Sequence, residues 1–120
     1  MDEYSSSIGI REVKILGNKL LLNGKQIYLK GFGKHEDASI IGKGLFLPLM
    51  VKDFELMKWI GANSFRTSHY PYAEETMFYA DKKGILVIDE VPAVSLDLSQ
   101  TNGKTLTCHK EFIRKLVERD

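Results

Sequence analysis

Short apolar runs alternate with longer helical patterns along this chain, and glycine or proline separates most of them. Three strand-like runs come first, between Ile10 and Lys30, and are divided by Gly17-Asn18 and Asn23-Gly24. Asn-Gly between apolar runs is a strong hairpin signal. The pattern predicts a short β lead-in, and its third run, Ile27–Lys30, is expected to be the first strand of the main fold.

Three helical stripes and two further strands come next. Helices are expected over Pro48–Ile60 and Thr107–Arg119, where apolar residues recur three and four positions apart. A helix is also expected over Pro71–Lys83, because its first turn is acidic, its last turn carries lysines and Gly84 follows as its end. Strands are expected at Ser64–Thr67 and Ile85–Asp89. The second of these, ILVID, is a continuous apolar run, which is typical of a strand buried on both faces. Strands that alternate with helices predict an α/β fold with a parallel sheet.

Polar residues gather where each of the three strands ends. The clusters are KHED at residues 34–37, RTSHY at residues 66–70, and Asp89-Glu90. The carboxyl ends of parallel strands meet at one edge of a sheet, and binding sites form there. The sequence therefore predicts that the three clusters share one rim.

Each of these residues also has a structural interpretation. His35 could be a loop residue, and His69 could cap the second helix. Asp89 and Glu90 could anchor a loop, and Arg66 is expected to be paired because a buried unpaired charge is costly. The joint pattern at three strand ends favours a site. His109 is expected to be a surface histidine.

Composition narrows the classes of function. The chain has 120 residues, a net charge of +1 and one cysteine, Cys108. The charge favours neither nucleic acid nor a membrane surface as partner, and no apolar run approaches the roughly 20 residues that span a bilayer. Residues Met1–Ser7 are expected to be a flexible lead-in rather than a signal peptide, and the expected location is cytoplasmic. No metal-ligand or dinucleotide motif is present, so no cofactor is expected.

Four stretches resemble the β-glucuronidases of glycoside hydrolase family 2: GFGKHED, IGKG, PLMVKDFELMKWIGANSFRTSHYPYAEE and GILVIDEVPAV. The resemblance implies a partial (β/α)8 TIM barrel, the first three βα units, preceded by a short β lead-in hairpin. Residues 1–26 would be the end of an upstream linker and the lead-in strands. Residues 27–120 would be the N-terminal part of the catalytic barrel domain.

The resemblance also implies a chemistry. A retaining glycosidase uses two carboxyl groups about 5 Å apart, and in this family the acid belongs to an Asn-Glu pair after strand four. No Asn-Glu pair occurs here. These residues would thus be an inactive fragment of an enzyme that hydrolyses β-glucuronides. Alternatives are a noncatalytic carbohydrate-binding or assembly module and another family 2 activity such as β-galactosidase.

The roles that the resemblance implies are non-catalytic. Contacts to the substrate would come from four residues: His35, Asp37, His69 and Tyr70. Three residues would support them from behind, with Asp89 and Glu90 pairing with Arg66 or His69 and Arg66 lying under the floor of the pocket. Exposed strand edges are expected to promote self-association.

Overall fold

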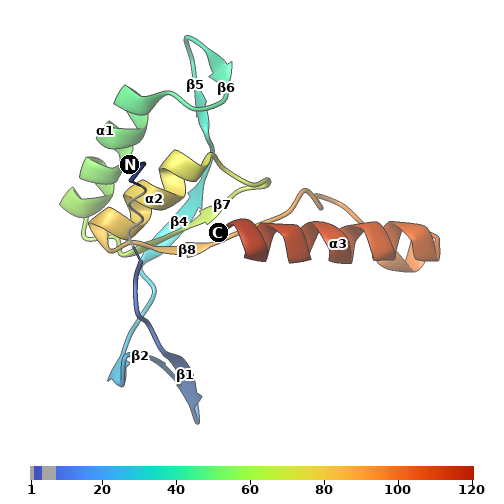
Figure 1. Ribbon diagram of the computed structural model, residues 1–120, viewed down its shortest axis with the longest axis horizontal. Helices are drawn as coiled ribbons and strands as arrows, with labels where there is room; N and C mark the ends of the chain where they lie inside the picture. The colour runs from blue at the N-terminus through green and yellow to red at the C-terminus, as the bar shows by residue number, and fades with distance from the viewer. Residues whose placement is uncertain (1, 4–7) are drawn as a thin grey trace.

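A parallel three-stranded sheet forms the centre of the computed structural model, which describes residues 2–3 and 8–120 (Figure 1). Its strand order is β4 (Gly31–Lys34), β7 (Ser64–Thr67) and β8 (Leu86–Ile88). Helix α1 (Leu47–Trp59) connects the first pair, and α2 (Glu74–Lys83) connects the second. The predicted alternation of parallel strands and helices is confirmed. The predicted flexible lead-in falls largely outside the described residues.

The first strand of this sheet begins later than predicted. Residues Ile27–Lys30 are not a strand; β4 starts at Gly31 and pairs with β7 from Ser64 onward. The reason is Asn63, whose side-chain oxygen accepts from the Lys30 N–H at 2.7 Å and whose amide donates to the Tyr28 carbonyl at 2.9 Å. The Asn63 side chain therefore satisfies the Lys30 N–H and the Tyr28 carbonyl in place of a strand partner.

Strand β4 carries two glycines because β7 lies too close for a side chain. A Cβ at Gly31 would stand 2.1 Å from the Ser64 carbonyl oxygen, and one at Gly33 would stand 2.6 Å from the Ser68 hydroxyl. Both distances are well below van der Waals contact. Glycine at these positions thus serves close approach within the sheet.

The core lies between α1, α2 and β7. The predicted stripe of α1 is confirmed, because Met50, Phe54 and Met57 are all buried. Phe54 meets Phe65 of β7 edge-to-face, with ring centroids 5.8 Å apart, a geometry that aromatic pairs favour. The remaining buried apolar residues are Tyr72 and Ala80.

Helix α2 begins at Glu74, three residues after the predicted start at Pro71. Residues Pro71–Ala73 stay outside the helix, since Tyr72 is 1% exposed and donates its hydroxyl to the Lys34 carbonyl at the end of β4. The predicted end at Gly84 is confirmed: this residue has φ +68° and caps the helix in the left-handed conformation.

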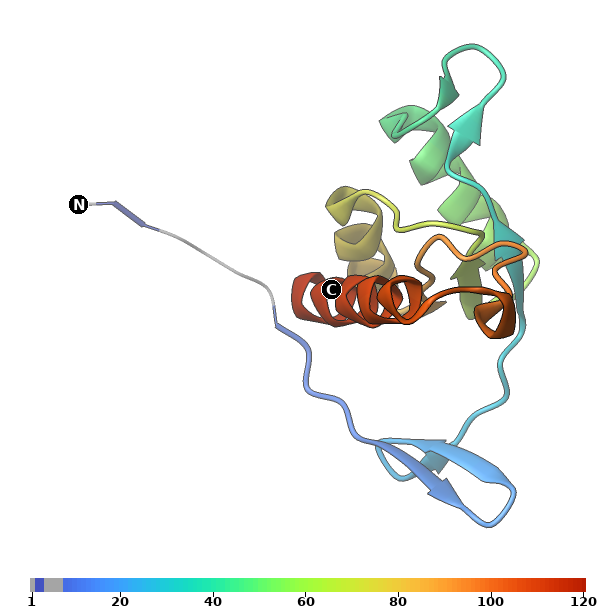
Figure 2. The same cartoon turned by 90° about the vertical axis from the view of Figure 1, so that its right-hand side faces the viewer.

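Two hairpins lie at opposite ends of the central sheet (Figure 1). The lead-in is an antiparallel sheet of β1 (Val13–Leu16), β2 (Lys19–Leu22) and β3 (Lys25–Gln26), with the predicted turn at Asn23-Gly24. Its third strand, β3, lies just before Ile27–Lys30, the third strand-like run of the sequence. At the other end, β5 (Asp37–Ala38) and β6 (Gly42–Lys43) form a short hairpin (Figure 2).

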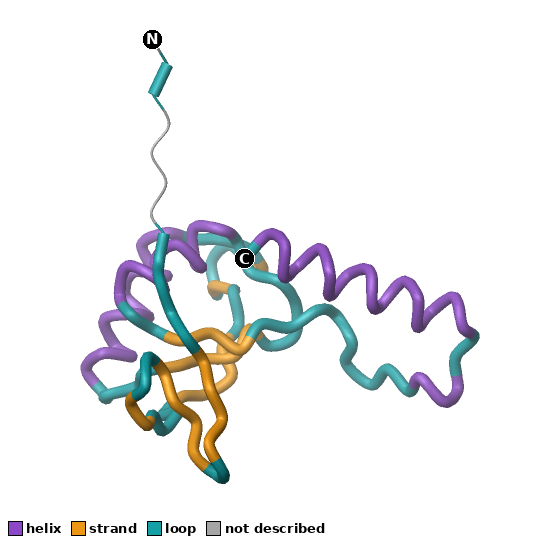
Figure 3. Tube along the Cα trace, turned by 60° about the horizontal axis from the view of Figure 1, so that its bottom comes forward, coloured by secondary structure: helices purple, strands orange, loops and turns teal. Residues whose placement is uncertain are grey.

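Helix α3 (Gly103–Arg119) projects from the sheet, and only its C-terminal end comes near β8 (Figures 1 and 3). It begins four residues before the predicted start, because the Asn102 side chain caps it by accepting from the Thr105 N–H at 3.1 Å. A short 3-10 helix, η1 (Leu98–Gln100), precedes it. No residue of α3 is buried.

Strand β8 is less buried than its sequence predicts. Leu86 and Val87 are half-buried, and Ile88 is 50% exposed. In the described part of the chain, β8 pairs with β7 alone, and most of α3 extends away from it (Figures 1 and 3). The expectation that ILVID is buried on both faces is wrong for this structure. Ile85 and Val87 pack against the core, but among the described residues the groove opens beside β8 and its outer edge has no strand neighbour.

Candidate functional site

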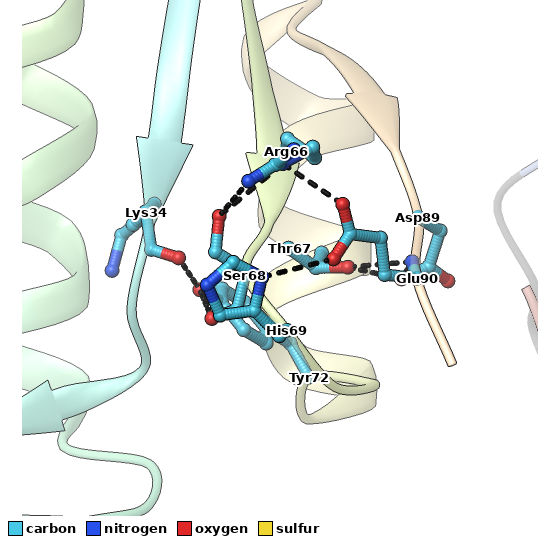
Figure 4. Close-up of polar contacts among 8 residues, drawn as sticks. All are labelled: Lys34, Arg66, Thr67, Ser68, His69, Tyr72, Asp89 and Glu90. Carbon is cyan, nitrogen blue, oxygen red and sulfur yellow. Dashed lines mark hydrogen bonds and ion pairs between the residues drawn. The ribbon is translucent and has the colours of Figure 1, made fainter. Parts of the chain in front are cut away.

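The three polar clusters meet at the carboxyl ends of β4, β7 and β8, as the sequence predicts (Figure 4). The rings of His35 and His69 approach edge-to-face with centroids 5.6 Å apart. The parallel register places Lys34 opposite Thr67 and Arg66 opposite Ile88, so residues that come after each strand emerge side by side. The rim thus gathers two imidazoles, a guanidinium and a carboxylate.

Glu90 links Arg66 and His69 at the rim. One of its carboxylate oxygens lies 2.8 Å from Arg66 Nε, and the other lies 3.4 Å from His69 Nδ1. Arg66 Nη2 also donates to the Ser68 hydroxyl at 3.2 Å. The expected pairing of Glu90 with Arg66 and His69 is therefore present. The Arg66 side chain is 46% exposed, so in this structure it lies at the surface of the rim rather than beneath a floor.

Asp89 has a different partner from the expected ones. Its Oδ1 accepts from the Thr67 hydroxyl at 2.7 Å, and the same hydroxyl accepts from the Glu90 N–H at 2.8 Å. Asp89 Oδ2 is buried without a hydrogen-bond partner among the residues that the structure describes. Burial raises the pKa of the Asp89 carboxyl above its ordinary value, and the Asp120 carboxyl adds to the rise. Asp89 thus fastens β8 to β7 and does not pair with Arg66 or His69.

Tyr70 and His35 form an aromatic corner beside the histidine pair. Their ring centroids are 6.1 Å apart, and the Lys43 ammonium from β6 lies 3.7 Å from the centroid of the Tyr70 ring, a cation–π contact. Asp37 is placed differently. It lies in β5, opposite Lys43 in register, and makes no side-chain hydrogen bond or ion pair with another described residue. The structure thus brings Tyr70 and His35 together and leaves Asp37 apart.

Glu36 is a polar residue of the rim to which sequence reasoning gave no role. Its carboxylate oxygens accept from the Ala73 N–H, each at 3.2 Å, and one accepts from the Thr76 hydroxyl at 2.8 Å. The N-cap of α2 is Ala73, which makes no side-chain capping bond. Glu36 therefore caps α2, a role that the sequence suggested for His69. The alanine at the N-cap could have indicated this, because an N-cap without a side-chain acceptor leaves helix N–H groups in need of a partner from elsewhere.

A groove of about 1000 Å³ adjoins the rim. Arg66, His69 and Glu90 line the end of the groove at the rim. Apolar side chains from α2, β8, the segment after β8 and α3 line most of the rest, and charged or titratable side chains lie among them, including Arg11, His109 and Asp120. Hydrogen-bond donors and acceptors next to an apolar wall suit a ligand that carries both hydroxyl groups and a hydrophobic face. The Glu90 carboxylate is already engaged by Arg66.

Two other kinds of feature are absent from residues 2–3 and 8–120. This part of the chain has no cluster of three or more side chains with metal-ligand chemistry. None of the helices there is both long and apolar enough to cross a membrane.

Comparisons with known proteins agree on one family. Residues 13–119 match the model of the glycosyl hydrolases family 2 TIM barrel domain. A β-glucuronidase from Paenibacillus borealis is 51% identical over an alignment of 129 positions, which covers 99% of this chain and 22% of that protein. The β-glucuronidase of Mus musculus is 52% identical over 120 residues, 99% of this chain and 18% of that protein.

Solved structures give the same picture. The β-glucuronidase of an uncultured Clostridium species superposes with a TM-score of 0.87 at 56% identity, covering 93% of this chain and 20% of that one. The Ruminococcus gnavus β-glucuronidase in complex with D-glucuronic acid superposes with a TM-score of 0.74 at 58% identity, covering 78% and 16%. The chain spans about a fifth of the length of these relatives. Since the family model covers nearly all of it, the chain belongs to glycoside hydrolase family 2 and is part of that family's TIM barrel domain.

Proposed function

We propose that these residues are the first three βα units of the catalytic barrel of a retaining β-glucuronidase. Strands β4, β7 and β8 would be the first three barrel strands, and the β1–β3 hairpin would lie at the bottom of the barrel. The observation that carries the proposal is the meeting of polar clusters at the carboxyl ends of adjacent parallel strands. Catalytic groups of TIM barrels lie at that face.

The rim would hold the glucuronic acid unit of a β-glucuronide. His35, His69 and Tyr70 would donate and accept hydrogen bonds with sugar hydroxyls, and Asp37 would lie further out, on the β5–β6 hairpin. The Arg66–Glu90 pair, 2.8 Å apart, would orient His69 from behind. Hydrolysis with retention needs two carboxyl groups on either side of the glycosidic bond. No Asn-Glu pair that would supply the acid occurs in these 120 residues, so their part is to bind and orient.

A chimera tests this proposal. The 120 residues replace the segment of the Mus musculus β-glucuronidase that aligns with them over 120 residues. Hydrolysis of p-nitrophenyl β-glucuronide and of p-nitrophenyl β-galactoside is then compared, with the unaltered enzyme as control. We expect turnover of the glucuronide and little of the galactoside. A folded chimera that prefers the galactoside, or that hydrolyses neither, contradicts the proposal.

The 120-residue chain alone provides the second arm. We expect no hydrolysis of the glucuronide, because pocket contacts without an acid and a nucleophile give little rate. Turnover above that of a His35→Ala chain, prepared in a host without its own glucuronidase, contradicts this expectation.

A further inference from the structure

We infer that Glu36 is a positioning residue, which sets the place of the sugar-binding side chains His69 and Tyr70 relative to His35. This inference rests on the proposed function. Glu36 comes directly after His35 in the chain, at the end of β4. His69 and Tyr70 lie in the segment that joins β7 to α2. Glu36 bonds to that segment through both its backbone and its side chain.

The backbone contact is to Tyr70. The N–H of Glu36 donates to the Tyr70 hydroxyl at 3.0 Å. This bond spans 34 residues of sequence and fixes the tip of the Tyr70 side chain against the segment that follows β4 and carries His35. The Tyr70 ring is thereby held between the His35 ring, 6.1 Å away, and the Lys43 ammonium.

The side-chain contacts are to the start of α2. The carboxylate accepts from the Ala73 N–H and from the hydroxyl of Thr76, a residue that is only 1% exposed. A carboxylate at a helix N-terminus is also favoured by the helix dipole. We call the four residues Glu36, Tyr70, Ala73 and Thr76 the Glu36 clamp. The clamp holds the 70–76 segment at both of its ends, and His69 lies in the chain between the clamp and β7.

A purely structural role for Glu36 would predict a different outcome from a positioning role. If Glu36 only capped α2, its loss would lower the melting temperature and leave the folded protein's kinetics unchanged. If it also places His69 and Tyr70, the folded protein would bind the transition state less well, because small displacements of positioning groups are costly in rate. The two roles are separated by kinetics at a temperature where every variant is fully folded.

The experiment uses the active chimera with four single variants and one double variant. Glu36→Ala removes the carboxylate, and Glu36→Gln keeps one acceptor oxygen. Thr76→Val removes the partner hydroxyl at nearly constant volume, and it is also combined with Glu36→Gln. Glu75→Gln is the matched control, since Glu75 is an exposed carboxylate in the same first turn of α2. The values of kcat, KM and the melting temperature are measured for each.

We expect Glu36→Ala to lower kcat/KM by about 10- to 100-fold, mainly through kcat, as for an interaction that acts in the transition state. Glu36→Gln should lie between the wild type and Glu36→Ala, and Glu75→Gln should lie within about twofold of the wild type. The double variant should lose less than the product of its single losses, because both changes break one interaction. Unchanged kcat/KM in Glu36→Ala, or a loss equal to that of Glu75→Gln, overturns the inference.

A second measurement separates this inference from the proposed function. NMR of the imidazole protons of His35 and His69 in the 120-residue chain reports their surroundings without any turnover. We expect Glu36→Ala to shift both sets of signals and to weaken the cross-peaks between the two rings, while Glu75→Gln leaves them in place. An inactive wild-type chimera with these shifts overturns the proposed function alone. Unmoved signals overturn the positioning role, whatever the activity.

Discussion

Two regions of this chain carry similar sequence patterns and fold differently. The unit built from β4, β7, β8, α1 and α2 contains every buried residue of the described chain, all between Met50 and Ala80. Helix α3 and the β1–β3 hairpin contain none. Helix α3 has the clearest amphipathic pattern, yet its apolar side lines a groove instead of a core. An amphipathic pattern therefore identifies a helix without determining that it is buried.

The contacts that hold α3 together are mostly local. Arg114 pairs with Glu111 at 2.6 Å and also with Glu118, three and four residues away on the same face. Such exposed pairs contribute little to stability, because water and dissolved salt screen them. The α1–α2 unit instead relies on buried aromatic and aliphatic contacts between distant residues. The candidate site lies on the unit with the stronger packing.

The largest expected effect contrasts two phenylalanines. Phe54 is 1% exposed in the core, and Phe112 of α3 is 59% exposed. We expect Phe54→Ala to lower the free energy of unfolding by about 3–5 kcal/mol and Phe112→Ala to change it by less than about 0.5 kcal/mol. Urea titration followed by circular dichroism measures both. Equal losses would show that α3 shares the core, and the contrast between the regions would fail.

The second effect contrasts two histidines in the chimera. His35 belongs to the rim, and His109 lies on α3. We expect His35→Ala to lower kcat/KM for the glucuronide by about 10- to 1000-fold, the order of one or two polar contacts that tighten in the transition state. His109→Ala should leave it within about twofold. A loss for His109 as large as that for His35 would move the site toward the groove and α3.

The third effect concerns the open edge of β8. In the part of the chain that the structure describes, this strand has one neighbour, and its Ile88 is 50% exposed. We expect the isolated chain to self-associate through this edge, and Ile88→Lys to weaken the association by about tenfold through like-charge repulsion between paired edges. Light scattering at micromolar concentration measures it. A chain that stays at its monomer mass of 13.6 kDa with a concentration-independent melt refutes the edge as a contact.

The smallest effect is a difference in pH dependence between Asp89 and Asp97. The folded chain holds the Asp89 proton more tightly than the unfolded chain, because burial raises the pKa of this carboxyl. The contribution of Asp89 is therefore most favourable at low pH and declines as pH rises from its ordinary pKa of 3.8 through the folded value. Asp89→Asn should remove this decline, so the variant gains stability relative to wild type as pH rises.

Asp97, in the segment that precedes η1, has the opposite sign. Hydrogen bonds from the Ser99 hydroxyl and N–H lower the pKa of its carboxyl. Its contribution is present above the ordinary value of 3.8 and is lost as pH falls through the folded pKa. Asp97→Asn should therefore lose stability relative to wild type as pH rises. Urea midpoints for the two variants between about pH 2 and pH 7 measure the slopes, and slopes of the same sign would contradict both assignments.

Much of the fold could be predicted from local patterns. The stripe of Met50, Phe54 and Met57, the strand at Ser64–Thr67 and the cap at Gly84 depend on short-range spacing and are confirmed. The first strand could not be placed, because the bonds that hold Tyr28 and Lys30 come from Asn63, more than 30 residues away. The half-exposed state of β8 could not be predicted from its sequence either, because it depends on which other elements pack against the strand.

The same division holds for the candidate site. The meeting of the clusters at one rim could be predicted from the parallel topology alone, and the partners of Glu90 agree with the expectation. The partner of Asp89 is Thr67, a neighbour on the adjacent strand that only the register reveals. Glu36 was missed because the two partners of its carboxylate, Ala73 and Thr76, lie about 40 residues away and give no periodic signal.

The missing side chain at Gly33 has a consequence for how this chain tolerates mutation. A β-carbon there would collide with the Ser68 hydroxyl at 2.6 Å and reach the Arg66 guanidinium at 3.6 Å. Arg66 in turn holds Glu90. Gly33→Ala, the smallest possible substitution, would therefore displace Ser68 and Arg66 and so disturb the ion pair between Arg66 and Glu90. In a saturation screen, Gly33 would be among the positions least able to vary, and it would behave like a site residue although it contributes no chemistry of its own.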